Sequence, residues 1–375
     1  MKANRSRLRI SKFCEKISSL SFYLSVVYYR KAWLIDGLKW KKEKSKDYPL
    51  DRLSVKKVWH GIRMNKAWLK FYNNIEREGN KNFDARYLPL DIQYCFIDDW
   101  FNDTPTALLL DDKNMYDMFF YDVKQPNTIA RIISRSFFDE NYIDLSIEQV
   151  IDRCSKQQKV IMKPTVGTSG GSGIVFWDVS EGQDVLKKFL LEHDNYVIQE
   201  VIRQHAEISR IYAESINSIR IVTCHYNGKT EVLSAVIRMG VNGNKLDNAS
   251  QGGLFCGINE DGTLKKYAYT KKGDAITVHP QGAVFSDCHI PNFDKCKELV
   301  IKLSNRFLRI AKLISWDLAV DEEGNPVLIE VNLCYGGTDI HQIANGPLYG
   351  DKTEEILDKV FRQSKKYSFI NKFVH

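Results

Sequence analysis

Residues 315–332, SWDLAVDEEGNPVLIEVN, contain two apolar strand-like runs separated by a polar turn at 323–326. This pattern predicts a hairpin, in which the second strand folds back beside the first. Glu330 and Asn332 lie two apart and therefore project from one face of a strand, and the hairpin brings Asp317 beside Glu330. Three oxygen-bearing side chains thus meet in an otherwise apolar run, and such donors are typical of a Mg²⁺ site.

The same residues also allow a structural interpretation. In that case Glu330 pairs with a buried arginine and Asn332 caps a turn. Burying two carboxylates without partners has a high cost in free energy, which argues against a purely structural arrangement.

Two arginines occupy a second predicted hairpin, SIRIVTCHYNGKTEVLSAVIRMG at 218–240, whose turn is Asn227-Gly228. Arg220 and Arg238 each stand within an apolar run, and an arginine in such a place needs an anionic partner. That partner is either a structural carboxylate or a phosphoryl group that is being transferred.

A glycine-rich loop, TSGGSG at 168–173, separates two further strand-like runs at 158–166 and 173–179. Its glycines leave backbone amides free to approach an anion, and Lys163 adds a positive charge nearby. The order of residues differs from GxxxxGK[ST], and a strand follows where that motif requires a helix. The loop is therefore either a structural turn or a flap over a nucleotide.

The chain has 375 residues, enough for two or three lobes with cores, and its 43% hydrophobic and 27% charged residues are ordinary for a globular protein. Its eight cysteines lack any CxxC pair, which argues against a zinc ribbon and favours free buried thiols in a reducing compartment. The first 30 residues lack an uninterrupted apolar run, so we expect a cytoplasmic protein without a transmembrane segment.

The net charge of +7 is unevenly distributed, because residues 1–70 hold 19 Lys and Arg against 5 Asp and Glu. Apolar residues at approximately helical spacing in 57–76 predict helix. Residues 1–85 are then either a helical cap on the main body or a basic surface for an anionic membrane or a phosphate-bearing polymer. No aromatic-basic motif supports nucleic-acid binding.

The order of VIMKP, the glycine loop, YVIQEVI, SINSIRIVT, DNASQGG and WDLAV…VLIEVN resembles the ATP-grasp superfamily. The phrases DDKNMYDMFF, SINSIRIVT and LDNASQGGLF most resemble the sugar-transfer-associated ATP-grasp proteins of bacterial surface-polysaccharide loci. The resemblance covers about residues 105–350 and implies an α+β fold in which ATP lies between the antiparallel sheets of two lobes. The predicted parts of the chain are a helical basic region (1–85), an N-terminal α/β part of the core (86–155), a lid lobe with the glycine loop (156–202) and a large lobe with the magnesium site and a C-terminal helix (203–375).

The resemblance also implies ATP and Mg²⁺ as cofactors and assigns residues to them. The residues expected to bind ATP are Lys113, Lys163, Thr168, Ser169, Gly170, Gly171, Ser172, Gly173, Gln199, Glu200, Val201, Ile202, His205, Asp317 and Asn332. The residues expected to bind magnesium are Asp317, Glu330 and Asn332. Those expected to stabilise the developing charge are Lys163, Arg220 and Arg238, and the ribose is assigned to Gln204 or His205.

Two polar loops are candidates for the substrate. One lies between predicted strands, and the other directly follows the predicted magnesium strand. The substrate residues expected in them are Asp247, Asn248, Gly252, Gly253, Tyr335, Gly336, Gly337 and Thr338.

The resemblance implies a carboxylate–amine ligase that forms an amide through an acyl phosphate, and the polysaccharide association favours a sugar uronic acid and an amino acid or other amine. One alternative is a kinase for a sugar or polyol hydroxyl, for which Asp339 is the candidate base. Another is a non-catalytic nucleotide-binding docking module. The partners expected are thus a small molecule or glycan, with the basic N-terminal region as a candidate membrane contact.

Overall fold

The computed structural model describes residues 43–62, 64–77, 82–167 and 170–363. The predicted features of residues 1–42 lie outside this range. The chain divides into two compact units, which we describe separately. The first unit comprises the described residues up to Phe101 together with those from Asn345 onward, and the second unit spans Asn102–Ala344.

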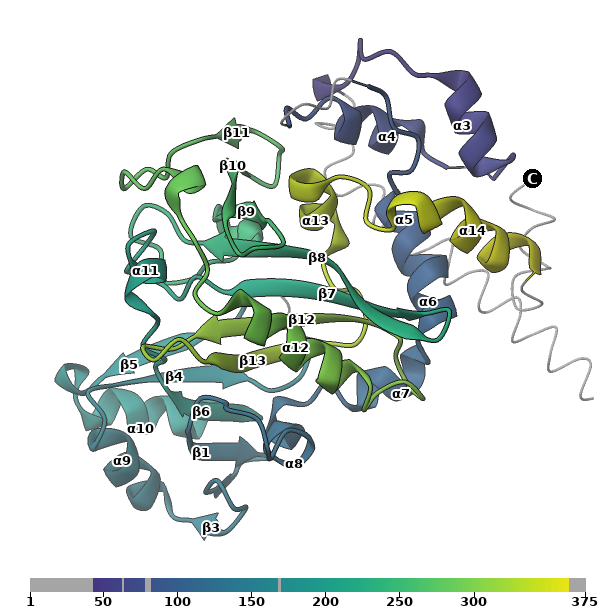
Figure 1. Cartoon of the computed structure of the whole chain (residues 1–375). Helices are drawn as coiled ribbons and strands as arrows, with labels where there is room; N and C mark the ends of the chain where they lie inside the picture. Colours follow the sequence, from purple (N-terminus) through teal and green to yellow (C-terminus); the bar gives the residue numbers. More distant parts are fainter. Residues whose placement is uncertain (1–42, 63, 78–81, 168–169, 364–375) are drawn as a thin grey trace, which may run out of the picture. The chain divides into compact units, whose positions relative to one another are not determined.

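The first unit is helical (Figure 1). It contains α3 (Arg52–Trp59), α4 (Lys66–Asn73), α5 (Leu90–Ile92), α6 (Asp98–Phe101) and α14 (Thr353–Asp358), with π-helical turns at Gln93–Ile97 and Lys359–Gln363. Asp51 begins α3 by accepting hydrogen bonds from the backbone N–H groups of residues 53 and 54. The helix ends at His60, whose φ is 44°, so the helical pattern predicted across 57–76 is interrupted there.

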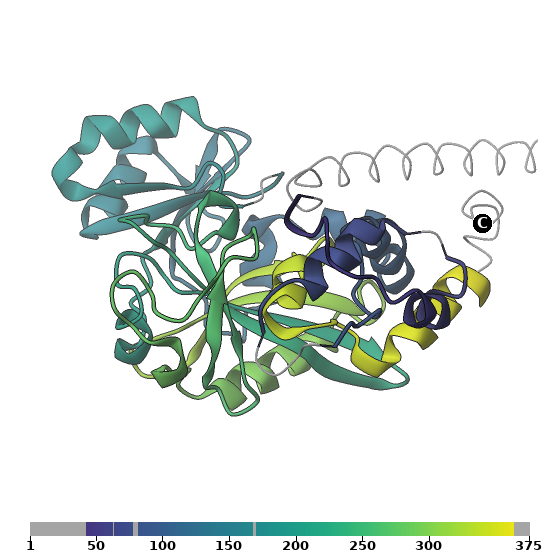
Figure 2. The same cartoon turned by 90° about the horizontal axis from the view of Figure 1, so that it is seen from above.

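The second unit begins with α7 (Thr104–Leu109) and α8 (Tyr116–Phe119) and then forms two lobes. The small lobe is a six-stranded antiparallel sheet in the order β3-β2-β1-β6-β4-β5, covered on one face by two helices (Figures 1 and 2). Its elements are β1 (Thr128–Ile133), β2 (Ser136–Phe138), β3 (Asp144–Leu145), α9 (Ile147–Ser155), β4 (Lys159–Pro164), β5 (Val175–Asp178), α10 (Gln183–Glu192) and β6 (Tyr196–Glu200). Strands from the predicted parts 86–155 and 156–202 therefore share one sheet.

The large lobe is a seven-stranded antiparallel sheet in the order β11-β10-β9-β8-β7-β12-β13. Its elements are α11 (Ala206–Ser209), β7 (Ile219–Tyr226), β8 (Lys229–Met239), β9 (Leu254–Ile258), β10 (Leu264–Tyr269), β11 (Ala275–Ile276), α12 (Phe293–Ser304), β12 (Leu313–Val320), β13 (Pro326–Asn332) and α13 (Thr338–Asn345). The two hairpins predicted at 218–240 and 315–332 are β7–β8 and β12–β13.

Successive side chains of these strands point to opposite faces of the sheet, so that one face is apolar and the other is polar. Ile221 and Trp316 pair across β7 and β12, belong to the core and lie on the face covered by α12. The Trp316 indole N–H donates to Thr223 Oγ1 at 3.0 Å and to Ser304 Oγ of α12 at 3.2 Å, which satisfies its only polar atom. The residues on either side of Ile221 and Trp316 along each strand therefore face away from α12.

No disulfide bond joins the cysteines that the structure describes, and most of these cysteines are buried. No helix among the described residues has the length and apolar character to span a membrane.

Candidate active site

The polar face of the large sheet brings the predicted metal and arginine residues together. Asp317 on β12 lies opposite Glu330 on β13 and, on its other side, opposite Arg220 on β7. Residues paired in this way across antiparallel strands share a face. The predicted approach of Asp317 to Glu330 is therefore found in the structure. Asn332 lies two residues along β13, on the same face and opposite Ser315.

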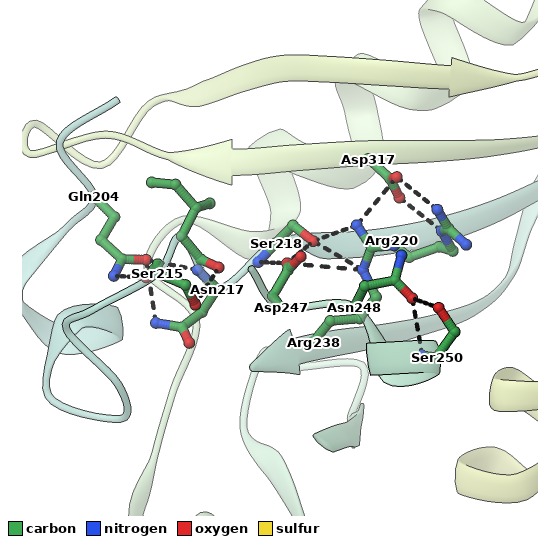
Figure 3. Close-up of polar contacts among 11 residues, drawn as sticks. Gln204, Ser215, Asn217, Ser218, Arg220, Arg238, Asp247, Asn248, Ser250 and Asp317 are labelled. Atoms are coloured by element: carbon green, nitrogen blue, oxygen red, sulfur yellow. Dashed lines mark hydrogen bonds and ion pairs between the residues drawn. The ribbon is translucent and has the colours of Figure 1, made fainter. Parts of the chain in front are cut away.

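Asp317 is enclosed by two arginines (Figure 3). Arg220 donates from Nε to Oδ1 at 2.7 Å and from Nη2 to Oδ2 at 2.6 Å, and Arg238 Nη2 donates to Oδ2 at 3.1 Å. Burial favours the neutral carboxyl, but the charges of Arg220 and Arg238 outweigh it and lower the pKa of Asp317 to about 2. Asp317 is only 1% exposed, so this is a buried ionised network.

The network continues to the first predicted substrate loop (Figure 3). Ser218 Oγ accepts hydrogen bonds from Arg238 Nε at 2.9 Å and Nη2 at 2.6 Å. The Ser218 hydroxyl donates to Asp247, whose Oδ2 also accepts from the Ser218 backbone N–H at 2.9 Å. Two carboxylates thus balance two guanidinium groups, and Asp247 ties its loop to β7.

Lys113 reaches Glu330 from the segment before the small lobe. Its Nζ lies 2.7 Å from Glu330 Oε1. Asp112 caps the turn that begins at Lys113, and the Tyr116 hydroxyl bonds to both the N–H and the C=O of Val331 at 3.2 Å. These contacts hold the turn against β13 and place the ammonium group beside the carboxylate.

Lys163 lies on β4 of the small lobe. Its Nζ donates to Gln199 Oε1 on β6 at 3.1 Å. Burial lowers the pKa of Lys163 to about 8, while the charge of Glu330 acts in the opposite direction. The positive charge of Lys113 lowers the pKa of Lys163 further, so the two lysines that are expected to bind ATP interact electrostatically.

Asp317, Glu330 and Asn332 have the donor chemistry for a magnesium ion. A carboxylate offers about four acceptor positions, and three of those on Asp317 are used, which leaves one on Oδ1. Glu330 and the amide of Asn332 supply further oxygens on the same face. Within the described ranges no three His, Cys, Asp or Glu side chains gather as a metal site. The candidate set combines two carboxylates with an amide.

The second predicted substrate loop, residues 334–339, follows β13, and its residues 336 and 337 pack over this face. Its last two residues, Thr338 and Asp339, form the first turn of α13. Tyr335 has φ of 55°, unusual for a bulky residue, and is 40% exposed. A Cβ on Gly336 would lie 2.0 Å from Ser315 Oγ, and one on Gly337 would lie 2.8 Å from Arg220 Nη1. Glycine is therefore required where the loop meets the network.

We expect Gly337→Ala to destabilise the protein more than Gly228→Ala. Both glycines have positive φ, 71° and 80°, but a Cβ at Gly228 meets no atom within 4 Å. Gly228→Ala should therefore cost about 1 kcal/mol from the backbone alone. Gly337→Ala should cost roughly 1–3 kcal/mol more, because Arg220 is held in place by Asp317. Urea unfolding measures both, and equal losses would contradict the proposed contact.

The glycine-rich loop is described from Gly170 onward, and the predicted residues Thr168 and Ser169 lie outside the described range. Gly170, Gly171 and Gly173 have positive φ, and a Cβ on Gly173 would lie 2.8 Å from Pro164 Cγ. Ser172 lies in the same turn before β5.

The glycine-rich loop also meets the first substrate loop. Gln251 Nε2 donates to the Gly170 carbonyl at 2.8 Å. Asn248 caps the short turn that contains Ser250, and a Cβ on Gly253 would meet three backbone oxygens within 2.9 Å. Gly252 has φ of 91°, a backbone conformation that favours glycine. The local backbone therefore favours glycine at both predicted positions of this loop, independently of any substrate.

Three of the predicted ATP-binding residues, 200–202, lie at the end of β6 and in the connection that follows it. Glu200 ends that strand, and its Oε1 accepts from the Asn127 N–H at 3.2 Å, while Val201 and Ile202 are half-buried in the connection. His205 Nδ1 caps α11 by accepting from the Glu207 N–H.

Gln204 is fully engaged within the protein (Figure 3). Its Nε2 donates to the carbonyls of Tyr212 and Ser215, and its Oε1 accepts from the N–H and the Nδ2 of Asn217. No donor or acceptor of the amide is left for a ribose. The structure therefore argues against the ribose assignment for Gln204, and His205 stays the prediction.

Two polar residues near the site, Arg131 and His341, are absent from the sequence predictions. Arg131, fully buried on β1, donates to the Asn114 carbonyl and lies 4.6 Å from the centre of the Tyr142 ring. The signal was an arginine in the apolar run TIARII, the same signal that identified Arg220. His341 is fully buried on α13, and its signal was weaker because a lone histidine on a helix is common in cores.

A family model for sugar-transfer-associated ATP-grasp proteins matches residues 96–356. The chain belongs to this family. The predicted α+β fold of ATP-grasp type is thereby confirmed, with its two antiparallel sheets. No curated protein matches the chain.

Solved structures of ATP-grasp type are also similar to the chain. They include D-alanyl-alanine synthetase A of Vibrio cholerae O1 biovar eltor (14% identity, 69% of this chain and 63% of that chain, TM-score 0.37), an L-amino acid ligase of Bacillus licheniformis (14%, 69% and 49%, 0.39) and phosphoribosylamine–glycine ligase of Thermotoga maritima (13%, 68% and 56%, 0.42). The chain spans less than two thirds of the length of each of these proteins.

Proposed function

We propose that this protein is an ATP- and Mg²⁺-dependent carboxylate–amine ligase whose substrates are a sugar uronic acid and an amino acid or other amine. The observation that carries the proposal is the polar face of the large sheet in a chain of the ATP-grasp family. There, Asp317, Glu330 and Asn332 stand beside Arg220 and Lys113. The choice of a uronic acid as the substrate is based on the description of the family, which associates the family with sugar transfer.

In the proposed reaction a carboxylate oxygen attacks the γ-phosphorus of ATP, the bond to the bridging oxygen breaks, and ADP leaves. The amine nitrogen then attacks the carbonyl carbon of the acyl phosphate, a C–N bond forms, the C–O bond to phosphate breaks, and the amine loses a proton. Lys113, Lys163 and Arg220 supply the positive charge that balances the transferring phosphoryl group. A magnesium ion on Asp317, Glu330 and Asn332 would neutralise phosphate charge and orient it.

Raising the pH from 7 to 9 is expected to weaken MgADP binding. Because the pKa of Lys163 is lowered to about 8, its ammonium loses the proton within this range, and the phosphates lose a positive partner. The dissociation constant should rise by up to about tenfold per pH unit above 8. Lys163→Arg keeps its charge, so its affinity should vary much less with pH. Calorimetry at several pH values measures this, and an identical rise in Lys163→Arg would contradict it.

The function itself is tested by release of phosphate from ATP. The protein is incubated with ATP and Mg²⁺, and with D-glucuronate and glycine separately and together. Phosphate release that requires both a carboxylate and an amine supports the ligase. Phosphate transferred to a sugar hydroxyl without an amine would support a kinase instead.

A further inference from the structure

Three buried polar atoms lie between the end of β13 and the middle of α13. They are Asn332 Nδ2, Thr338 Oγ1 and His341 Nε2, and none has a hydrogen-bond partner among the described residues. Thr338 is 2% exposed and His341 is fully buried. Buried polar atoms are nearly always paired, so three unpaired ones in a short segment indicate a place that receives a ligand group.

The fold brings these atoms to one region. Thr338 and His341 are three residues apart on α13 and therefore share a face of that helix. His341 Nδ1 lies 2.9 Å from Ser234 Oγ on β8. Ser234 belongs to the same row of paired residues across the sheet as Ser315 and Asn332.

This row adjoins the row that carries the candidate catalytic groups. Val236, Arg220, Asp317 and Glu330 pair in turn across β8, β7, β12 and β13, two residues from the first row along each strand. A group bound beside His341 would therefore lie next to the proposed magnesium and phosphate positions. This is where a substrate that receives the phosphoryl group must be.

The charge state of His341 defines its role. Burial, followed by the charges of Arg220 and Arg238, lowers the pKa of His341 to about 3, while Asp317 acts in the opposite direction. The ring is therefore neutral at the pH of the cell and acts through hydrogen bonds. When the Ser234 hydroxyl donates to Nδ1, Nε2 carries the proton and is a donor.

The unpaired atoms then match one kind of ligand group. The amide Nδ2 of Asn332 is a donor, the Thr338 hydroxyl can donate, and so can His341 Nε2. A carboxylate only accepts, and it also suits the neighbouring guanidinium group of Arg220. We propose that Thr338 and His341 bind the carboxylate of the substrate that is activated, with His341 as a specificity-determining residue. This rests on the proposed ligase function.

Two substitutions of His341 separate binding from structure. Asparagine places its amide nitrogen near the position of Nδ1 and can keep the contact with Ser234, whereas glutamine reaches the position of Nε2. D-glucuronate is titrated by calorimetry into the full chain loaded with MgADP. We expect His341→Asn to weaken binding by about tenfold or more and His341→Gln to stay within about threefold of the wild type. Thr338→Val, which removes only the hydroxyl, should also weaken binding by about tenfold.

The opposite pattern would overturn the inference. Glucuronate binding retained in His341→Asn and lost in His341→Gln would assign His341 a structural role through Ser234. Equal binding by all variants, or no binding of D-glucuronate and D-galacturonate by the wild type, would also overturn it. This titration needs no turnover, so it stays separate from a failure of the ligase reaction, which appears as absent phosphate release. Melting temperatures show whether each variant is folded.

Discussion

Turnover is expected to fall by about a hundredfold or more when Glu330 is replaced by glutamine, since even residues that only support metal ligands cost 10–100-fold. The substitution keeps the size of the side chain and removes one negative charge from the face shared with Asp317. Without that charge the proposed magnesium ion loses an anionic ligand, and Lys113 loses its ion-pair partner at 2.7 Å. Steady-state phosphate release measures the effect.

Glu323→Gln is the matched control for this prediction. Glu323 lies in the turn of the same hairpin, its side chain is 66% exposed, and the same charge is removed. We expect its turnover to stay close to that of the wild type. Glu330→Gln with normal activity would refute the metal assignment, and equal losses in both variants would point to the hairpin itself.

Asp317→Asn is expected to destabilise the second unit by roughly 3–5 kcal/mol, the cost of leaving buried charges without their partner. Arg220 and Arg238 both bond to Asp317, and their side chains are only 13% and 9% exposed. An asparagine amide offers no compensating charge and directs N–H groups at two donors. Chemical denaturation followed by circular dichroism measures the loss.

Asp152→Asn provides the comparison. Asp152 on α9 pairs with Lys156, which directly follows the helix, and both side chains are about two-thirds exposed. Removal of the Asp152 charge should therefore change stability by less than about 1 kcal/mol. The pH dependence gives a second test. The folded pKa of Asp317 is about 2, below its value near 3.9 in an unfolded chain, so its contribution is present above pH 4 and lost as the pH falls through 2. Asp317→Asn should lack this component of acid unfolding, and an unchanged acid transition would contradict the network.

The hairpins and their shared face were predictable from the sequence because they depend on local patterns. Asn227-Gly228 has the positive φ angles that such a turn requires, and the two-residue period put Glu330 and Asn332 on one face. The open question of what partners the arginines have is answered in part. Arg220 and Arg238 bind Asp317, which leaves both arginines beside the proposed phosphate position.

What could not be predicted depends on contacts between distant parts of the chain. The pairing of β1 with β6 joins segments predicted as separate parts, and no local pattern encodes it. The bonds of Gln204 to residues 212–217 depend on a loop whose path is set by the sheet. No local pattern distinguishes His341 either, because its second ring nitrogen is buried without a partner among the described residues only in the folded chain.

Activation of a carboxylate by ATP is tested most directly with an isotope label. D-glucuronate labelled with ¹⁸O in its carboxylate is incubated with the protein, ATP, Mg²⁺ and glycine, and the released phosphate is analysed by mass spectrometry. An acyl phosphate intermediate transfers one carboxylate oxygen to phosphate, so we expect phosphate that carries a single ¹⁸O. Consumption of ATP that yields only unlabelled phosphate would contradict it.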